Sequence, residues 1–470
     1  MLPASPAIGV VVASISFWSG LPGPASLCAW VAVTCALWWI FESLHIAVVG
    51  LLPFVALPLT GIVDHKLVAS QYGHTMILLL LGGFFLSAAM ERSGAHRRIA
   101  LAMVRAVGGN GGKRLVLGFM LATASLSMWI SNAATTLMMI PIALAILGQA
   151  GDKTLERPLL LGMAYAASVG GMATPIGTPP NLIFMSVLEE TFDKQMSFAT
   201  WMSYALPIVV VLFPMIWWWV TRSIRGAKKI EMPEAGAWRP SEVRVLVIFT
   251  CAAFLWVFRQ GPWGGWSGLI PGGSAIGDAT VGLAASMALF ICPAGEDLSS
   301  KTDETASEST SSPRPVERLL DWDTAAKVPW GILIMFGGGL ALAKGFELTG
   351  LSQAIGGQLA FFAEAPAWVV VLSVCLLVTF LTEITSSTAT ATLLLPILGA
   401  LSVETGLPPE TVMIPGTISA SCAFMLPVAT APNVIVFSSG KVRTDEMART
   451  GLFLNFFAAG VITVIVMLMR

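Results

Sequence analysis

Apolar stretches long enough to cross a membrane recur along almost the whole chain. A hydrocarbon core about 30 Å thick requires roughly 20 apolar residues of helix. The stretches that approach this length cover residues 6–22, 25–44, 46–62, 74–91, 160–185, 200–221, 245–260, 279–294, 328–346, 411–438 and 450–469. This pattern predicts an all-α polytopic membrane protein with about 11 transmembrane helices.

Two further apolar runs, 115–149 and 369–403, are too long for one crossing. Each has a polar cluster at its centre, "SNAATT" at 131–136 and "TEITSSTATAT" at 382–392. A helix–turn–helix hairpin that enters and leaves by the same face fits this pattern. Such re-entrant backbone is tolerated only beside protein or a water-filled cavity. We therefore predict two re-entrant hairpins in addition to the spans.

Two of the predicted spans, 160–185 and 411–438, contain helix-breaking pentapeptides, "GTPPN" at 177–181 and "ATAPN" at 429–433. Proline and glycine interrupt helices. Breaking a helix frees backbone N–H groups at one new end and carbonyl groups at the other. Each of these spans is therefore predicted to be a broken helix with exposed backbone ends at membrane depth.

The hairpins and broken helices belong to an internal repeat. "LGGFFLSAAMERSG" (81–94) matches "FGGGLALAKGFELTG" (336–350), and "SNAATTLMMIPI" (131–142) matches "SSTATATLLLPI" (386–397). The two pentapeptides follow in the same order. Three matching segments at nearly constant spacing indicate two copies of one structural unit.

Charge shows how the two copies are oriented. Residues 92–114 carry several Lys and Arg, whereas the equivalent residues 348–370 carry none, and this bias reverses after the broken helices. Basic residues stay on the cytoplasmic side, so the copies lie upside-down relative to one another, as in many secondary carriers. We expect a cytoplasmic N-terminus and cytoplasmic loops at 222–244 and 296–327, the second of them Ser/Thr/Glu/Pro-rich and disordered.

These features predict a division of the chain into successive parts. The parts are N-terminal scaffold helices and the start of repeat 1 at 1–91, transport unit 1 at 92–221 (hairpin 115–149, broken helix 160–185), a loop at 222–244, scaffold helices at 245–295, a loop at 296–327, and repeat 2 at 328–470 with transport unit 2 (hairpin 369–403, broken helix 411–438).

Composition agrees with a membrane protein and excludes several classes of function. Of the 470 residues, 56% are hydrophobic and only 11% charged, and the mean hydropathy is +0.80. The net charge of −1 argues against a nucleic-acid partner. No HExxH or GxSxG motif nominates an enzyme, and no motif indicates an organic cofactor.

The chemistry of the breaks points to ions. Half-helix N-termini are partly positive and attract anions, while freed carbonyls and hydroxyl or amide oxygens suit a hard cation such as Na⁺. Polar residues gather at the turn of each hairpin, here called its tip, and at each break. In each copy the tip faces the break. The sequence predicts two cation sites with an anion between them.

Several of these stretches resemble the divalent anion:sodium symporter family, which includes Na⁺-coupled dicarboxylate, citrate and sulfate carriers. The resemblance covers nearly the whole chain and rests on "WWIFESLHIAVVGLLPFVALPLTGI", "GGFFLSAAMERSGAHRRIAL", "SNAATTLMMIPIA", "IGTPPN", "TEITSSTATATLLLPI" and "ATAPN". It implies a homodimer in which each protomer has a scaffold domain and a mobile transport domain that works by an elevator movement, in the lipid bilayer of a bacterial inner membrane.

The resemblance also implies site residues. The family's two Ser-Asn-Thr motifs fall on the two tips, and the substrate-binding residues are Ser131, Asn132, Ala133, Thr178, Ser386, Ser387, Thr388 and Thr430. The implied Na⁺ ligands are Ser127, Ser131, Asn132 and Gly177 for one site and Thr382, Thr385, Ser387 and Ala429 for the other. Ala133 and Ser387 depart from the motifs, because one lacks the hydroxyl and the other lacks the amide.

The function expected from these residues is secondary transport of small divalent anions, C4-dicarboxylates above all, by symport with Na⁺. The alternatives are a Na⁺-independent anion exchanger or a sulfate or sulfonate carrier of the same fold, and an anion channel. Capped sites at the membrane midplane favour alternating access over a channel.

Overall fold

The computed structural model describes residues 4–18, 20–107, 112–150, 152–224, 237–260, 265–295, 316–359 and 362–470. Within these ranges the chain is helical, and its one β-type pairing is an isolated bridge between Pro293 and Arg318. The predicted all-α class is confirmed. Eight described helices are long and apolar enough to cross a membrane, and four shorter apolar helices accompany them. The count of about 11 spans stays a prediction.

The helices follow one another in two similar series. The chain opens with α1 (Ala4–Trp18), α2 (Gly23–Ile40), α3 (Ile46–Leu59) and α4 (His65–Tyr72). The first series comprises α5 (Thr75–Ser93), α6 (Ala95–Val107), α7 (Gly112–Ser127), α8 (Asn132–Ala150), α9 (Lys153–Met172), α10 (Pro179–Phe192) and α11 (Phe198–Thr221). The connecting helices are α12 (Pro240–Val257), α13 (Asp278–Ile291) and α14 (Trp322–Ala325). The second series comprises α15 (Trp330–Thr349), α16 (Leu351–Gln358), α17 (Ala367–Thr382), α18 (Ser387–Thr405), α19 (Pro409–Ala420), α20 (Ala431–Ser438) and α21 (Thr444–Met469).

The two series repeat the same order of elements, as the sequence repeat predicts. In both, a Gly-rich helix ends at a left-handed glycine, Gly94 with φ 78° and Gly350 with φ 74°. A side chain other than glycine is strained in that conformation. A shorter helix, a helical hairpin, a broken helix and a long helix then follow in each series. The turns of the hairpins and the interruptions of the broken helices fall at the polar clusters and at the pentapeptides.

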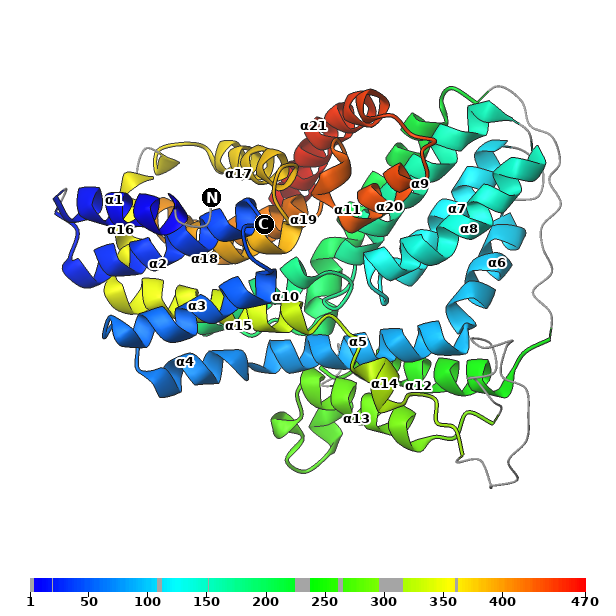
Figure 1. Ribbon diagram of the computed structural model, residues 1–470, viewed down its shortest axis with the longest axis horizontal. Coiled ribbons are helices and arrows are strands. Elements are labelled where there is room, and N and C mark those ends of the chain that lie inside the picture. Colours follow the sequence, from blue (N-terminus) through cyan, green and yellow to red (C-terminus); the bar gives the residue numbers. More distant parts are fainter. Residues whose placement is uncertain are drawn as a thin grey trace.

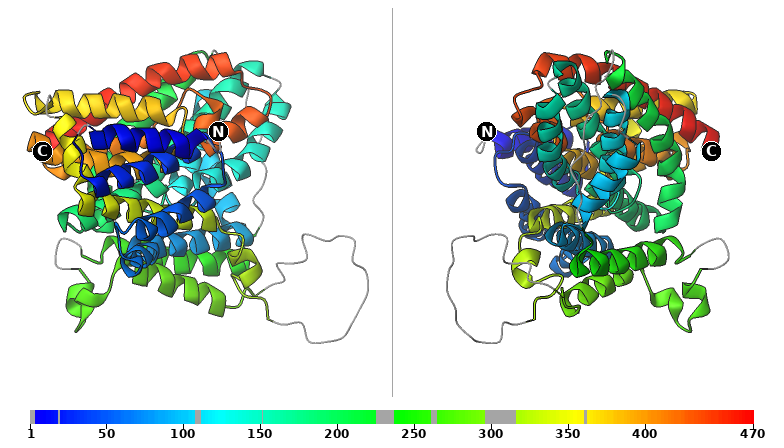
Figure 2. Two further views of the ribbon diagram at one scale, coloured as in Figure 1. Left: turned by 60° about the vertical axis from the view of Figure 1, so that its left-hand side comes forward. Right: turned by 90° about the vertical axis from the view of Figure 1, so that its right-hand side faces the viewer.

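Packing separates the helices into groups (Figure 1). Helices α7, α8 and α9 lie side by side, and α17 packs on α19 and α21. Helix α5 carries α12 and α13 along one edge of the molecule, while α15 packs on α3 and α4. The two views of Figure 2 show the same grouping of the helices from other sides. A smaller core joins α2, α3 and α15, and a larger one runs through the hairpins and broken helices.

Ion pairs bind the connecting segments to the ends of the Gly-rich helices. Arg92 lies 2.6 Å from Asp321, and Arg98 lies 2.8 Å from the buried Glu242. Within α15, Lys344 contacts Glu347 at 2.9 Å. Residues 225–236 of the predicted loop 222–244, and residues 296–315 of the predicted disordered loop 296–327, lie outside the described residues.

Candidate functional site

The first tip is the turn between α7 and α8. The Ser127 hydroxyl donates to Asn132 Oδ1 at 2.5 Å, and the Thr136 hydroxyl donates to the Asn132 carbonyl at 2.8 Å. Ser131 Oγ accepts the Ala134 N–H at 3.2 Å, which caps the start of α8. The Asn132 side chain is therefore held by the helix that precedes it, while its backbone carbonyl is bound within its own helix.

The first break, between α9 and α10, is closed by the asparagine of "GTPPN". The Asn181 amide nitrogen donates to the carbonyls of Gly171 at 3.0 Å and Thr174 at 2.8 Å, two of the groups freed where α9 ends. The Thr174 hydroxyl in turn donates to the Met128 carbonyl at the first tip. A Cβ at Gly177 would clash with the Gly171 carbonyl oxygen, so only glycine fits there.

The second tip is the turn between α17 and α18. The Thr382 hydroxyl donates to the Ala420 carbonyl at 2.9 Å and lies 3.4 Å from the Ser387 hydroxyl. The hydroxyls of Thr385 and Thr390 are 2.5 Å apart. In this tip a hydroxyl replaces an amide, because Ser387 stands where the first tip has Asn132.

A buried carboxylate ties the second tip to the second break. Glu383, 3% exposed, accepts the backbone N–H groups of Phe424 (2.7 Å), Met425 (2.9 Å) and Leu426 (2.9 Å). It also accepts the side-chain amide of Asn455 on α21 at 2.7 Å. All four partners donate, and the two carboxyl oxygens of Glu383 have enough lone pairs to accept all four bonds. Among the described residues, the first copy has the hydroxyl of Thr174 at the corresponding place, and it donates to the Met128 carbonyl.

The second break repeats the closure of the first. The Asn433 amide nitrogen donates to the carbonyls of Ala423 and Leu426, both at 3.0 Å. Thr430 caps α20, and its hydroxyl accepts the Asn433 N–H at 3.4 Å. Both pentapeptide asparagines therefore bind carbonyls at or just after the end of the preceding half-helix, so their amide nitrogens are engaged within the fold.

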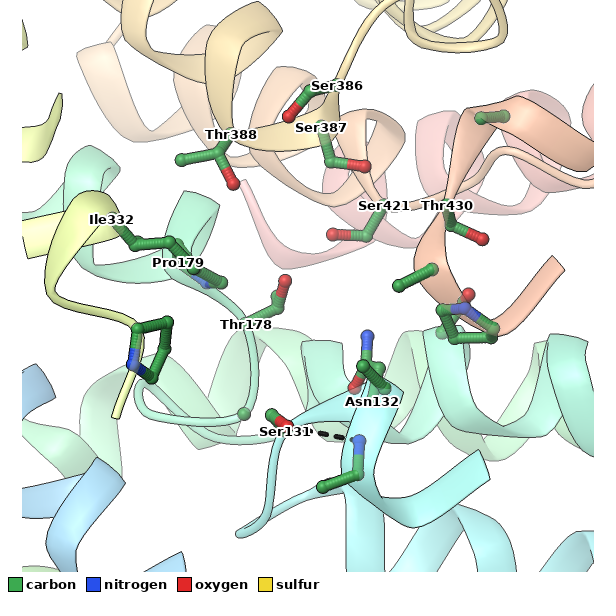
Figure 3. Close-up of a pocket in the computed structure, with 18 of the residues that line it drawn as sticks. Ser131, Asn132, Thr178, Pro179, Ile332, Ser386, Ser387, Thr388, Ser421 and Thr430 are labelled. Atoms are coloured by element: carbon green, nitrogen blue, oxygen red, sulfur yellow. Dashed lines mark hydrogen bonds between the residues drawn. The ribbon is translucent and has the colours of Figure 1, made fainter. Parts of the chain in front are cut away.

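Both tips and both breaks line one cavity of about 810 Å³ (Figure 3). Figure 3 shows Ser131 and Asn132 approaching from one side and Ser386, Ser387 and Thr388 from the opposite side. The structure brings together every residue predicted for the substrate, namely Ser131, Asn132, Ala133, Thr178, Ser386, Ser387, Thr388 and Thr430. Their assignment to substrate binding stays a prediction.

Most of the predicted Na⁺ ligands also line this cavity: Ser131, Asn132, Gly177, Thr385, Ser387 and Ala429. Ser127 and Thr382 do not. They lie one layer behind the tips, where Ser127 contacts Asn132 and Thr382 contacts Ser387. The two predicted ligand sets therefore occupy opposite walls of one chamber, with hydroxyl, amide and carbonyl oxygens and no carboxylate among their predicted ligands.

The positive electrostatic potential in the cavity comes from helix N-termini rather than from basic side chains. Helices α8, α10, α18 and α20 all begin at its wall, with Asn132, Pro179, Ser387 and Ala431 in the lining. Each helix N-terminus is equivalent to about half a positive charge. Among the described residues that form the lining there is no Lys, Arg or His, and the ionisable ones are Glu42 and Glu91.

Among the serines of the lining that the sequence did not nominate are Ser168 of α9 and Ser421 at the end of α19. They are 1% and 3% exposed, and neither hydroxyl has a partner in the described part of the chain. Their only signal in the sequence is a position a few residues before each pentapeptide. Lys344 also lies within an apolar run, but it points elsewhere and pairs with Glu347.

Comparison with known families and proteins agrees with this geometry. The family profile described as "Sodium:sulfate symporter transmembrane region" matches residues 2–469. A sodium-dependent dicarboxylate transporter SdcS from Staphylococcus saprophyticus is 38% identical over 453 residues, which is 92% of this chain and 83% of that protein. The transporter of the same name from Staphylococcus aureus is also 38% identical over 453 residues, with the same shares covered.

Two solved structures share the fold. The YdaH transporter of Alcanivorax borkumensis superposes with a TM-score of 0.59 at 16% identity, covering 94% of this chain and 98% of that one. MtrF of Neisseria gonorrhoeae, described as an antimetabolite efflux pump, superposes with a TM-score of 0.58 at 14% identity, covering 85% and 82%. At these identities the likeness concerns the fold alone.

Proposed function

Because this chain belongs to the sodium:sulfate symporter family, we propose that it is a secondary transporter that imports small divalent anions, C4-dicarboxylates above all, by symport with Na⁺. One observation carries the proposal. The cavity joins four helix N-termini to a described lining without a basic side chain. Such a chamber attracts an anion but supplies no fixed cation to neutralise it.

Magnitudes favour Na⁺ as the missing charge. A helix N-terminus stabilises a nearby anion by about 0.3–1 kcal/mol, and by about 2 kcal/mol in the best partly buried geometry. A cation about 4 Å from a carboxylate contributes about 4 kcal/mol at an effective dielectric constant near 20. At the ordinary magnitude the four helix ends together supply about 1–4 kcal/mol and two Na⁺ ions about 8 kcal/mol. The ions also offset the carboxylates of Glu42 and Glu91 in the lining.

In this proposal the two Na⁺ ions lie on either side of the anion. The first set is Ser127, Ser131, Asn132 and Gly177, and the second is Thr382, Thr385, Ser387 and Ala429. Bound Na⁺ orders each tip against its break and raises the positive potential between them. The anion affinity then rises with bound Na⁺, and by linkage the Na⁺ affinity rises with bound anion.

We infer a conformation open to the cytoplasm from the helix ends around the cavity. Glu42 follows α2, Glu91 lies near the end of α5, and Ile332 lies near the start of α15. With a cytoplasmic N-terminus these are all cytoplasmic ends. On the opposite side Lys344 lies 4.0 Å from Glu190 of α10, which ties the first broken helix to α15.

Transport then requires the hairpins and broken helices to move against the scaffold, which is an elevator movement. The moving units are those expected at 92–221 and within 328–470, and the scaffold comprises the helices at 1–91 and 245–295. The assembly that fits this division is a homodimer in a bacterial inner membrane. The lipid bilayer holds each scaffold while the transport units cross it.

An uptake panel in proteoliposomes tests the proposal. Succinate, L-malate, citrate and sulfate are offered with an inward gradient of Na⁺, K⁺ or choline. Accumulation of a C4-dicarboxylate above equilibrium with Na⁺ alone supports symport. Equal uptake in K⁺ indicates a Na⁺-independent exchanger, currents without accumulation indicate a channel, and uptake of sulfate but no dicarboxylate gives the site a different substrate.

A further inference from the structure

We infer that Ser421 selects substrates that carry a hydroxyl group between their two carboxylates, so that the preferred cargo is a 2-hydroxy C4-dicarboxylate rather than an unsubstituted one. The inference rests on the proposed function, because it takes the two tips as the places where the carboxylates bind. It assigns a partner to the substrate hydroxyl, which neither tip is expected to bind.

Ser421 is one of several buried hydroxyls without a partner in the described ranges, and it differs from its neighbour Ser419 in lining the cavity. Buried Ser and Thr side chains commonly bond back to the preceding turn, as Thr417 does to the Met413 carbonyl at 2.8 Å and Ser402 to the Gly399 carbonyl at 2.6 Å. The Ser421 hydroxyl has no partner in the described part of the chain although the residue is 3% exposed. An unpaired buried hydroxyl costs about 1–3 kcal/mol.

The direction of Ser421 points to a ligand. The Ser421 backbone N–H is bound to the Ile418 carbonyl at 3.0 Å, which fixes the residue where α19 ends. Figure 3 shows its hydroxyl directed into the space between the Ser387 and Thr178 side chains. This space lies between the second tip and the first break, where the carbon chain of a bound dianion would run.

Ser168 supplies a second hydroxyl without a partner in the described ranges to the same cavity. It lies on α9, which is the counterpart of α19 in the first copy. Among the buried hydroxyls without a partner in the described ranges, Ser168 and Ser421 are the two that line the cavity. A serine hydroxyl both donates and accepts, and a substrate hydroxyl has the same two capacities. A methylene group satisfies neither.

Discrimination follows from this pairing. A site built to bond a substrate hydroxyl rejects the analogue that lacks it, because its own polar group is then left unpaired. We therefore expect L-malate to be transported with a KM at least about tenfold lower than that of succinate. Replacing Ser421 removes the difference and leaves the carboxylate contacts of the tips in place.

The test compares L-malate and succinate uptake under an inward Na⁺ gradient for the wild type, Ser421→Ala and Ser419→Ala. Ser419 is the matched control, a buried serine two residues earlier on α19 that does not line the cavity. Ser421→Ala is expected to raise the L-malate KM about tenfold or more and to change the succinate KM less than about twofold. Unchanged succinate uptake also shows that the variant is folded.

Other outcomes overturn the inference in distinguishable ways. Equal KM values for both anions in the wild type refute it while leaving Na⁺ symport intact. So does an equal loss for both anions in Ser421→Ala, or the same effect from Ser419→Ala. If neither anion is taken up in Na⁺, the proposed function fails and the inference fails with it.

Discussion

The most informative single substitution is Gly171→Ala on α9. A Cβ at this position would lie 2.5 Å from Asn132 Oδ1 and 3.0 Å from Asn132 Nδ2. Ordinary contact begins near 3.4 Å, so the amide must retreat by about 0.9 Å, the difference between 3.4 and 2.5. The obstacle is the end of a side chain, and alanine is a better helix former than glycine by about 1 kcal/mol. The fold should therefore tolerate the change while the first tip does not.

The expected effect is a loss of Na⁺ affinity. Retreat of the amide disrupts the 2.5 Å bond from Ser127 to Asn132 and moves a proposed Na⁺ ligand. A buried hydrogen bond broken in this way costs about 1–3 kcal/mol. At about 1.4 kcal/mol for each factor of ten, the Na⁺ concentration for half-maximal uptake should rise about 5- to 140-fold.

The assay is the initial rate of dicarboxylate uptake into proteoliposomes at increasing external Na⁺. Gly148→Ala on α8 is the matched control, because a Cβ there meets nothing within 4 Å. The control should keep the wild-type Na⁺ dependence and melting temperature. If Gly171→Ala also keeps the Na⁺ dependence within about twofold, Asn132 does not position Na⁺ and the assignment of the first site is wrong.

Three further predictions concern the charged groups that hold the fold. Glu383→Ala removes an acceptor of four hydrogen bonds, so uptake should fall at least about tenfold; unimpaired uptake would show that the second tip needs no such tie. Arg98→Ala leaves Glu242 with one fewer cationic partner and should lower the melting temperature in detergent, by several degrees if the loss is about 3 kcal/mol; an unchanged value would show that Arg239 alone satisfies the carboxylate. Burial raises the pKa of Asp321, but its hydrogen bonds from Thr324 and the charge of Arg92 outweigh this and leave the pKa below its ordinary value. The contribution of Asp321 to the free energy of unfolding is therefore complete above an ordinary aspartate pKa of about 3.9 and is lost as the pH falls through the lower folded pKa. Asp321→Asn should therefore weaken the fall of the melting temperature at acidic pH. An unchanged fall would contradict the assignment.

The sequence predicts the parts of the fold that are encoded locally. Proline and glycine in "GTPPN" and "ATAPN" interrupt any helix that contains them, and the structure begins α10 and α20 within these pentapeptides, after α9 and α19 have ended. The polar clusters at 131–136 and 382–392 fall at the hairpin turns for the same reason, because their side chains offer the backbone alternatives to a continuous helix.

Contacts between distant segments cannot be predicted in this way. Glu383 lies near a tip in the sequence, but its partners are three backbone N–H groups about 40 residues away and an amide on α21. Asn181 and Asn433 carry amide oxygens that suit a cation, yet their amide nitrogens bind the carbonyls freed at each break. Ser421 gives no signal beyond its position before "ATAPN", because only packing decides whether a helical hydroxyl bonds back or faces a cavity.

The central claim is that Na⁺ supplies the positive charge that the cavity lacks. It is tested most directly by equilibrium binding of a radiolabelled C4-dicarboxylate to the purified protein, in Na⁺ and in K⁺ at equal ionic strength. The account predicts binding that strengthens as Na⁺ rises and is absent in K⁺, together with Na⁺ binding that strengthens when the anion is present. Equal affinity in K⁺ and Na⁺ would contradict it.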